Sequence, residues 1–187
     1  MRDFPSSSSL GLEGALLIAH PSLLDPNFRR TVLYMISHDA VDGSLGIVLN
    51  RALDKTVGDL LALPDLGALA SIPVFSGGPV SSDRMTFAVF GWERETQTVA
   101  CRLNVELEEA KELAEEGEDV VRAFVGYAGW SGGQLEAELE KKAWVVQKPD
   151  REVLDPESCK QMWAATLRTY GPWFRLMAET PDDPSRN

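Results

Sequence analysis

The chain has 187 residues, of which 44% are hydrophobic and 25% charged, a size and composition that fit one globular domain or at most two small ones. Its 18 Lys and Arg against 29 Asp and Glu give a formal net charge of −11, which disfavours direct binding to nucleic-acid phosphates or anionic membranes. The two cysteines, Cys101 and Cys159, are too few for a secreted disulfide framework, and no apolar run approaches the ~20 residues of a membrane helix. We therefore expect reduced thiols and a cytoplasmic protein without a membrane anchor.

The two ends of the chain differ in composition from its middle. A run of serines occupies Ser6 to Ser9, the first sustained apolar run begins at Ala15, and residues 179–187 are polar. Segments of this kind have little to bury. We expect a flexible leader over 1–13, a single domain over 14–178 and a flexible tail over 179–187.

Short apolar runs rich in β-branched residues predict strands in the first part of the chain. Three of them cover residues 15–19, 32–36 and 45–49, and Asp42-Gly43 between the last two predicts a hairpin turn. A short helix is expected to begin at Thr56, whose side chain can cap it.

Further strands and helices alternate along the rest of the chain. The predicted strands, of which the first three form an antiparallel meander, cover 72–75, 85–90, 99–103, 124–128 and 144–146. Amphipathic helices are predicted over 105–117, where Gly117 can end the helix, and over 134–143.

The clearest predicted helix is the last one. It begins at Asp155-Pro156, carries Cys159 on its apolar side and stops at Gly171-Pro172. Strands and helices do not follow the regular βαβ rhythm of a nucleotide-binding sheet. The pattern predicts an α+β fold of mostly antiparallel, coiled or bifurcated sheets with several helices packed outside.

One segment matches a catalytic motif. Residues 129–133 read G-x-S-x-G, between a predicted strand and a predicted helix, which is the setting of the nucleophile in an esterase. That fold requires a histidine after the serine, whereas His20 and His38 both precede Ser131. A glycine-rich turn capped by a serine explains the same residues without catalysis.

Two glycine clusters allow backbone N–H groups to approach an anion or a carboxylate, namely residues 77–79 and 129–133. Neither matches the loops that bind phosphates in nucleotide-binding proteins, and tight turns explain them equally well. The visible metal-ligand types, at His20, Asp25 and His38, lack the spacing of a metal site. We therefore expect no metal and no cofactor, and a turn in which Asp25 caps its own backbone.

Several ordered motifs together resemble the AlgH/YqgE family of bacterial cytoplasmic proteins. They are Leu16–Phe28, His38, Gly46–Arg51, Phe75–Val80, Gly126–Trp130 and Gln134-Leu135-Glu136. The resemblance implies a compact α+β domain of bifurcated, coiled sheets with helices outside. It implies little about activity, because the family is largely uncharacterised and some members are labelled transcriptional regulators without an evident DNA-binding motif.

The chain departs from the family pattern at three places. Ala52 follows Asn50-Arg51 where relatives usually have proline, and Phe90 stands where relatives often have histidine. Ser131 and Gly132 replace the usual Gly-Pro after Trp130. Because Ser131 is not the residue of the family, it does not explain what the family shares.

These motifs favour a noncatalytic binding or regulatory domain. Loops 25–30, 50–51, 76–79 and 129–134 are expected to converge on one rim around a small polar pocket for an unknown small molecule or protein partner. The candidate binding residues are Asp25, Asn27, Asn50, Arg51, Gly77, Gly78, Pro79, Tyr127, Gly129, Trp130 and Gln134.

Alternatives remain open for the residues and for the function. Asp25, Asn50 and Gln134 can instead satisfy loop backbone groups. A hydrolase or transferase of unknown substrate would use Ser131 or an Asp25/His20 pair, and a transcriptional regulator would act through a partner rather than by direct DNA contact. The sequence does not assign an oligomeric state.

Overall fold

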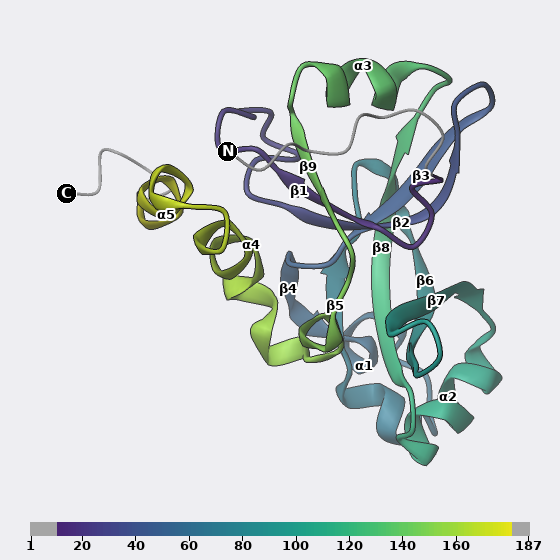
Figure 1. The fold of residues 1–187 in the computed structure, drawn as a ribbon. Helices are drawn as coiled ribbons and strands as arrows, with labels where there is room; N and C mark the ends of the chain where they lie inside the picture. The colour runs from purple at the N-terminus through teal and green to yellow at the C-terminus, as the bar shows by residue number, and fades with distance from the viewer. Residues whose placement is uncertain (1–10, 181–187) are drawn as a thin grey trace.

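The computed structural model describes residues 11–180 of the chain, so most of the expected leader and tail lie outside the described residues (Figure 1). The strands of this range form one curled sheet in the order β4-β5-β8-β3-β2-β1-β9, to which β6 is joined through β8 and β7 through β6. The strands are β1 (Leu16–Ala19), β2 (Val32–Asp39), β3 (Gly43–Val48), β4 (Ala52–Thr56), β5 (Pro73–Ser76), β6 (Val80–Glu93), β7 (Thr98–Val105), β8 (Val120–Trp130) and β9 (Trp144–Gln147).

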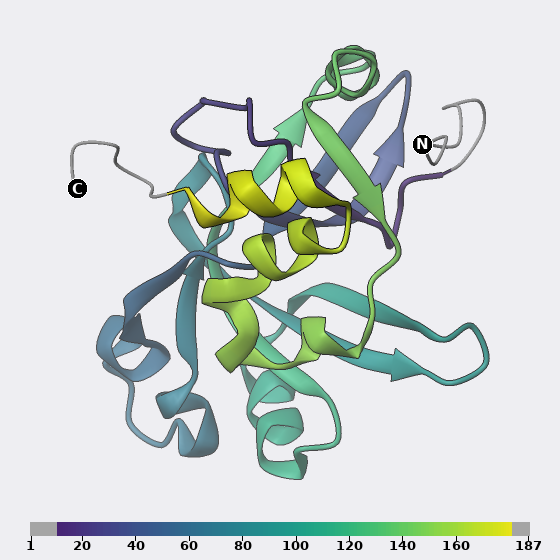
Figure 2. The same cartoon turned by 60° about the vertical axis from the view of Figure 1, so that its left-hand side comes forward.

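Helices pack around this sheet, which gives the α+β fold expected from the sequence (Figures 1 and 2). The α-helices are α1 (Val57–Leu61), α2 (Leu107–Glu116), α3 (Gln134–Glu140), α4 (Cys159–Arg168) and α5 (Pro172–Glu179), and the 3-10 helices are η1 (Gly67–Ser71), η2 (Arg151–Leu154) and η3 (Pro156–Ser158). None of the helices within residues 11–180 is long and apolar enough to cross a membrane.

Many local features follow the sequence expectations. The β2–β3 and β6–β7 hairpins form as predicted. Thr56 caps α1 in a reciprocal capping box with Asp59, because each side chain accepts the other residue's backbone N–H. Gly117 ends α2 in the left-handed conformation at φ 68°.

Other features differ from the expectations. The predicted antiparallel meander is wrong for its first strand, because β5 pairs in parallel with β8 and antiparallel with β4 instead of pairing with β6. The sequence pattern predicts neither β4 nor α5. Helix α5 begins at Gly171-Pro172, where the sequence predicts only the end of the preceding helix, because proline also fits the first turn of a new helix. Leu12, placed in the leader, is only 9% exposed and packs in the core.

Strand β8 occupies the centre of the sheet and pairs along both of its edges. Phe124 faces Phe75 of β5 on one edge and Thr86 of β6 on the other. The chain from β5 to β6 must therefore cross β8, and it does so through residues 77–79. At this crossing a Cβ on Gly78 would lie 2.2 Å from the Tyr127 carbonyl carbon, so the backbones meet where only glycine fits.

The helices cover two hydrophobic clusters. The larger lies between the sheet and helices α3 and α4, and it includes Met35, Leu135 and Trp163. The smaller lies where α1 and α2 approach the other end of the sheet, around Leu69 and Phe87. In Figure 1, α3 lies at one end of the molecule and α2 at the other, with β8 running between them.

The segment from η2 to α4 covers a buried cation. Among the described residues, Arg122 is the only charged residue in the buried class, at 1% exposure, and its guanidinium carbon lies 5.6 and 5.4 Å from the ring centroids of Phe75 and Phe90. Its Nη2 donates to the Val153 carbonyl at 2.6 Å, while Nε and Nη1 have no hydrogen-bond partner in the described chain. Burial lowers the pKa of Arg122, and the nearby Cys159 partly offsets this effect. The helical segment is thus joined to the sheet through a desolvated charge.

We predict that Gly78→Ala destabilises the protein far more than Gly117→Ala. Both glycines have positive φ, at 152° and 68°, but a Cβ at Gly78 meets backbone atoms whereas a Cβ at Gly117 has no atom within 4 Å. We expect a loss of about 2–5 kcal/mol for Gly78→Ala and about 1 kcal/mol for Gly117→Ala, measured by urea unfolding. Equal losses in the two variants would contradict the crossing as the critical constraint.

Candidate functional site

The chain segment after β3 holds the loop of residues 25–30. The Asn50 side-chain nitrogen donates to the Arg30 carbonyl at 2.9 Å, and its oxygen accepts the N–H of Val32, also at 2.9 Å. Asn50 therefore replaces a missing backbone partner at the point where the loop enters β2.

Arg51 binds the other part of the same loop. Its Nη2 donates to the carbonyls of Pro26 and Arg29 at 3.0 and 3.2 Å. Within the loop the Asp25 carboxylate accepts the N–H of Asn27 at 2.7 Å, which confirms that Asp25 caps its own backbone. Four candidate residues thus act together to shape one turn.

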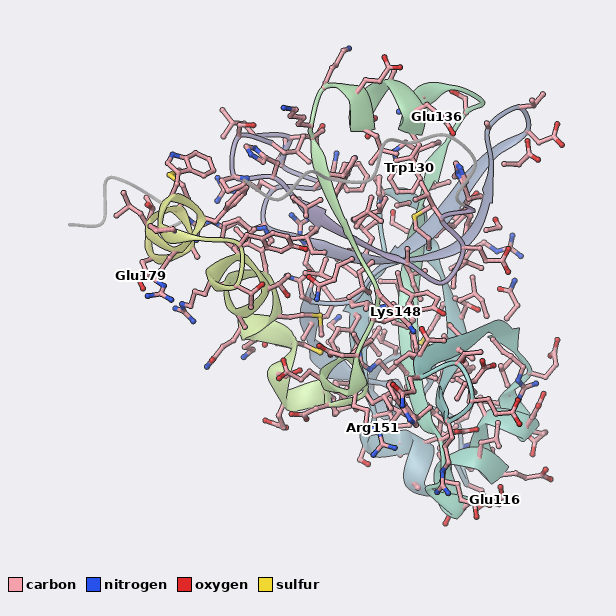
Figure 3. The ribbon with its side chains drawn as sticks, in the orientation of Figure 1. Glu116, Trp130, Glu136, Lys148, Arg151 and Glu179 are labelled. Atoms are coloured by element: carbon pink, nitrogen blue, oxygen red, sulfur yellow. The ribbon has the colours of Figure 1, made fainter. Side chains whose placement is uncertain are left out.

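This turn places Phe28 against two tryptophans. The Phe28 ring stacks on Trp130 with centroids 6.2 Å apart and meets Trp144 edge-on at 5.8 Å. Glu138 of α3 accepts both indole N–H groups through Oε2, at 3.0 Å from Trp130 and 2.7 Å from Trp144. We call these four residues the tryptophan cluster; Figure 3 shows Trp130 at the end of the sheet next to α3.

Ser131 lies just before α3, whose N-cap is Gly133. Its N–H and its hydroxyl each lie 3.2 Å from Gln134 Oε1, and Gln134 Nε2 donates to Glu138 Oε1 at 3.1 Å. No hydrogen bond within residues 11–180 joins Ser131 to a histidine. The G-x-S-x-G serine therefore has an amide as its neighbour rather than a general base.

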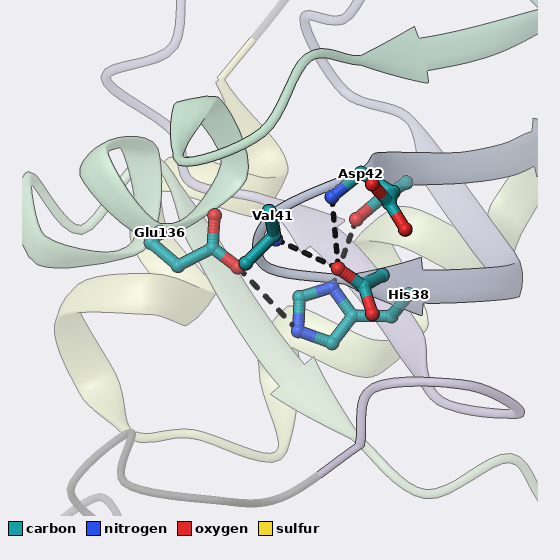
Figure 4. Close-up of polar contacts among 6 residues, drawn as sticks. His38, Val41, Asp42 and Glu136 are labelled. Carbon is teal, nitrogen blue, oxygen red and sulfur yellow. Dashed lines mark hydrogen bonds and ion pairs between the residues drawn. The ribbon is translucent and has the colours of Figure 1, made fainter.

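A serine, a histidine and a glutamate meet at a different place (Figure 4). Ser44 and His38 face each other across the β2–β3 hairpin and share a hydrogen bond of 2.8 Å between Oγ and Nδ1. His38 Nε2 lies 3.5 Å from Glu136 Oε1 on α3. Because Ser44 pairs with Trp130 across the strands, its side chain points to the face covered by α3. These contacts connect the β2–β3 hairpin with α3.

The opposite face of β3 and β8 is open. There a shallow cavity of about 420 Å³, which we call the bowl, is lined by Ser37, Asp42, Gly43, Ser44, Leu45, Val80, Tyr127, Gly129 and Trp130. Ser44 and Trp130 border the bowl although their side chains contact His38 and Glu138 on the α3 side. The Tyr127 ring lies against Gly129, since a Cβ at Gly129 would be 3.4 Å from Tyr127 Cε2. In the described chain the hydroxyls of Ser37 and Tyr127 and the Asp42 carboxylate have no hydrogen-bond or ion-pair partner. Apolar walls and unpaired polar groups therefore share one concave surface.

The glycine clusters do not offer their amides freely. The Gly77 N–H donates to the Val125 carbonyl at 2.8 Å, and the Gly133 N–H donates to the Ala40 carbonyl at 2.9 Å. Residues 77–79 serve the crossing over β8 and lead into Val80, a wall of the bowl. Two amides that the sequence offered to an anion are thus engaged in the fold.

The structure divides the candidate residues between two neighbouring places. Tyr127, Gly129 and Trp130 line the bowl. Gln134 orders the start of α3, and the loop held by Asn50 and Arg51 reaches Trp130 through Phe28. Asn50 and Arg51 therefore contact the bowl only indirectly, because the loop that they hold packs Phe28 against Trp130.

Comparison with known proteins assigns the family. A family model described as DUF179, AlgH-like, matches residues 16–175. The chain belongs to the AlgH-like family. A UPF0301 protein of Streptomyces coelicolor is 39% identical over 190 residues, covering 94% of this chain and 95% of its own length. Another, of Thermobifida fusca, is 36% identical over 193 residues, covering 95% and 96%.

Solved structures agree with this AlgH-like assignment. The solution structure of the AlgH protein of Pseudomonas aeruginosa has a TM-score of 0.64 and 29% identity, covering 96% of this chain and 100% of that one. A crystal structure of a Corynebacterium diphtheriae protein also has a TM-score of 0.64, at 22% identity, and shares the fold. Neither relative's name states an activity.

Several residues of the bowl and the tryptophan cluster are not among the candidates predicted from the sequence of this AlgH-like chain. Phe28 belongs to one of the AlgH-like motifs, but the sequence does not indicate its contact with Trp130, because the two stacked rings come from distant segments. The spacing of Gln134 and Glu138 on one helix face was the available signal for Glu138. Ser37 and Asp42 gave no signal, because exposed polar residues on a strand and a turn are ordinary.

We predict that Glu138→Ala destabilises the protein by about 2–4 kcal/mol, because it leaves two partly buried indole N–H groups without an acceptor. The control is Glu140→Ala on the same helix, an exposed position for which we expect less than about 0.5 kcal/mol. Urea unfolding followed by tryptophan fluorescence measures both. Similar values for the two variants would show that the tryptophan cluster does not depend on Glu138.

We also predict a pH effect at His20, whose ring stacks on Trp173 at 5.6 Å. Burial, together with the positive charge of Lys142, lowers the pKa of His20 from its ordinary 6.5. Neutral His20 therefore stabilises the fold above pH 6.5, and this contribution is lost as the pH falls through the folded-state pKa.

An NMR titration of the His20 ring checks this directly and should give a midpoint below 6.5. As the pH falls below 6.5, stability should decrease less steeply in His20→Gln than in the wild type. A midpoint at or above 6.5 would contradict the prediction.

Proposed function

We propose that this AlgH-like protein is a noncatalytic binding domain and that the bowl on β3 and β8 is its binding site. The observation that carries the proposal is the meeting of two unpaired hydroxyls and one unpaired carboxylate with apolar walls in an open cavity. A cavity of about 420 Å³ falls within the size range of small-molecule sites. Unpaired polar groups in such a cavity are the groups that orient a ligand.

The architecture behind the bowl supports this proposal. Its floor includes Gly129, where the absence of a side chain leaves the backbone of β8 accessible from the Tyr127 face. Trp130, the next residue, packs on the other face in the tryptophan cluster. A floor held by such packing is pre-organised, which lowers the entropy cost of binding.

The alternative functions receive less support. A hydrolase or transferase would need an activated nucleophile, but Ser131 contacts Gln134, and Asp25 and His20 are engaged with Asn27 and Ser22. The net charge of −11 does not favour direct contact with DNA, so a regulatory role would act through a ligand or protein partner. We propose that the protein acts in the cytoplasm, where its two thiols, Cys101 and Cys159, would stay reduced.

The test is a fragment screen by ¹H–¹⁵N NMR with the amides of Gly43, Leu45 and Gly129 as reporters. We expect hits to shift these amides, and Tyr127→Phe and Ser37→Ala each to weaken binding by about 2- to 10-fold, because each removes one hydroxyl partner. Ser131→Ala, outside the bowl, should leave the affinity unchanged. Hits that shift other regions, or that bind Tyr127→Phe and Ser37→Ala equally well, would contradict the bowl as the site.

A further inference from the structure

The charge on the bowl has one sign. Among the residues that line it, Asp42 is the only charged one, and none is basic. The carboxylate of Asp42 has no partner in the described chain, so its charge is not neutralised within the fold. A negative charge at the edge of a concave surface favours a ligand of opposite sign, although exposure to solvent weakens the attraction.

The turn that carries Asp42 adds to this negative potential. Asp39 Oδ1 accepts the N–H groups of Val41 and Asp42 at 2.7 and 2.8 Å (Figure 4). These hydrogen bonds lower the pKa of Asp39, whose carboxylate is negatively charged at neutral pH. The nearby imidazole of His38 is directed to Glu136 on the face covered by α3.

The wall of the bowl suits an organic cation rather than a bare metal ion. The described residues contain no group of three or more His, Cys, Asp or Glu side chains placed to hold a metal. The bowl instead offers the aromatic ring of Tyr127, whose π-system attracts cations, and the aliphatic side chains of Leu45 and Val80. An ammonium group with an apolar substituent would use all of these features at once.

We propose that the bowl selects organic cations: an ammonium group would pair with Asp42 and lie near the Tyr127 ring, while its hydrocarbon part contacts Val80 and Leu45. This inference rests on the proposed function and specifies its ligand class. It departs from the anion site that the glycine clusters suggested, because the Gly77 and Gly133 amides are engaged in the fold.

The test compares three probes of nearly equal shape and different charge, namely benzylammonium, benzyl alcohol and benzoate. Each is titrated into the full chain at low salt, and the Gly43 and Gly129 amides are followed by NMR. We expect benzylammonium to bind about three- to tenfold more tightly than benzyl alcohol, and benzoate to bind least. The preference should shrink as salt is added, because Asp42 is exposed to solvent.

Two variants of similar shape locate the selectivity. Asp42→Asn keeps the turn and removes the charge, so benzylammonium should then bind no better than benzyl alcohol. Asp65→Asn, at an exposed position distant in the chain, should leave the preference intact. Loss of the preference in Asp65→Asn, or its persistence in Asp42→Asn, would overturn the assignment to Asp42.

The failure of this inference can be separated from the failure of the proposed function. If benzyl alcohol or benzoate shifts the bowl amides as strongly as benzylammonium does, the bowl binds ligands but does not select cations. If none of the probes shifts these amides at high concentration, the cation site is overturned. The fragment screen then decides separately whether the bowl binds any other ligand.

Discussion

The fold depends on the crossing of β8 by residues 77–79. A strand that pairs in parallel on one edge with β5 and antiparallel on the other with β6 requires its neighbours to be connected across its own backbone. That connection is possible only if no side chain stands between the two chains, which Gly77 and Gly78 ensure. Gly126, at φ 71°, supplies the matching gap on β8 itself. Once the crossing is made, the sheet divides, with β3 beside one part of β8 and β5 beside the next.

The two faces of β3 and β8 beyond this division have different roles. One face is closed by α3 through Glu138, Glu136 and the aromatic rings that they approach. The other presents Tyr127, Leu45 and Ser37 to solvent. Because adjacent residues of a strand point in opposite directions, packing Trp130 on the closed face leaves Gly129 on the open one. The bowl is therefore a direct result of how tightly the opposite face is packed.

The sequence was informative wherever a local rule decides the structure. The capping box at Thr56, the turn at Asp25 and the hairpin at Asp42-Gly43 all depend on nearby residues, and all formed as expected. The AlgH-like motifs also indicated the divided sheet. The parallel pairing of β5 and the burial of Leu12 depend on contacts between distant segments, which periodicity does not encode.

The candidate site shows the same division. The sequence motifs include Asn50, Arg51 and Trp130, but the contacts of these residues involve Phe28 and Glu138, which come close only in the folded chain. Conversely, Ser131 matches a catalytic sequence motif, but its hydroxyl contacts the Gln134 amide in the turn before α3. A motif records which residues are near each other in the chain, whereas chemistry depends on which groups are near each other in space.

The buried guanidinium of Arg122 bears on the accuracy of folding. Its hydrogen bond to a backbone carbonyl goes to Val153, which belongs to a short 3-10 turn. If the helical segment closed one residue out of register, the desolvated cation would lose this carbonyl, at a cost of several kcal/mol. A hydrocarbon side chain at this position would tolerate such slippage. Arg122 thus discriminates against misplaced closures, so the position of the C-terminal segment is specified by the penalty for error as much as by the contacts of the correct arrangement.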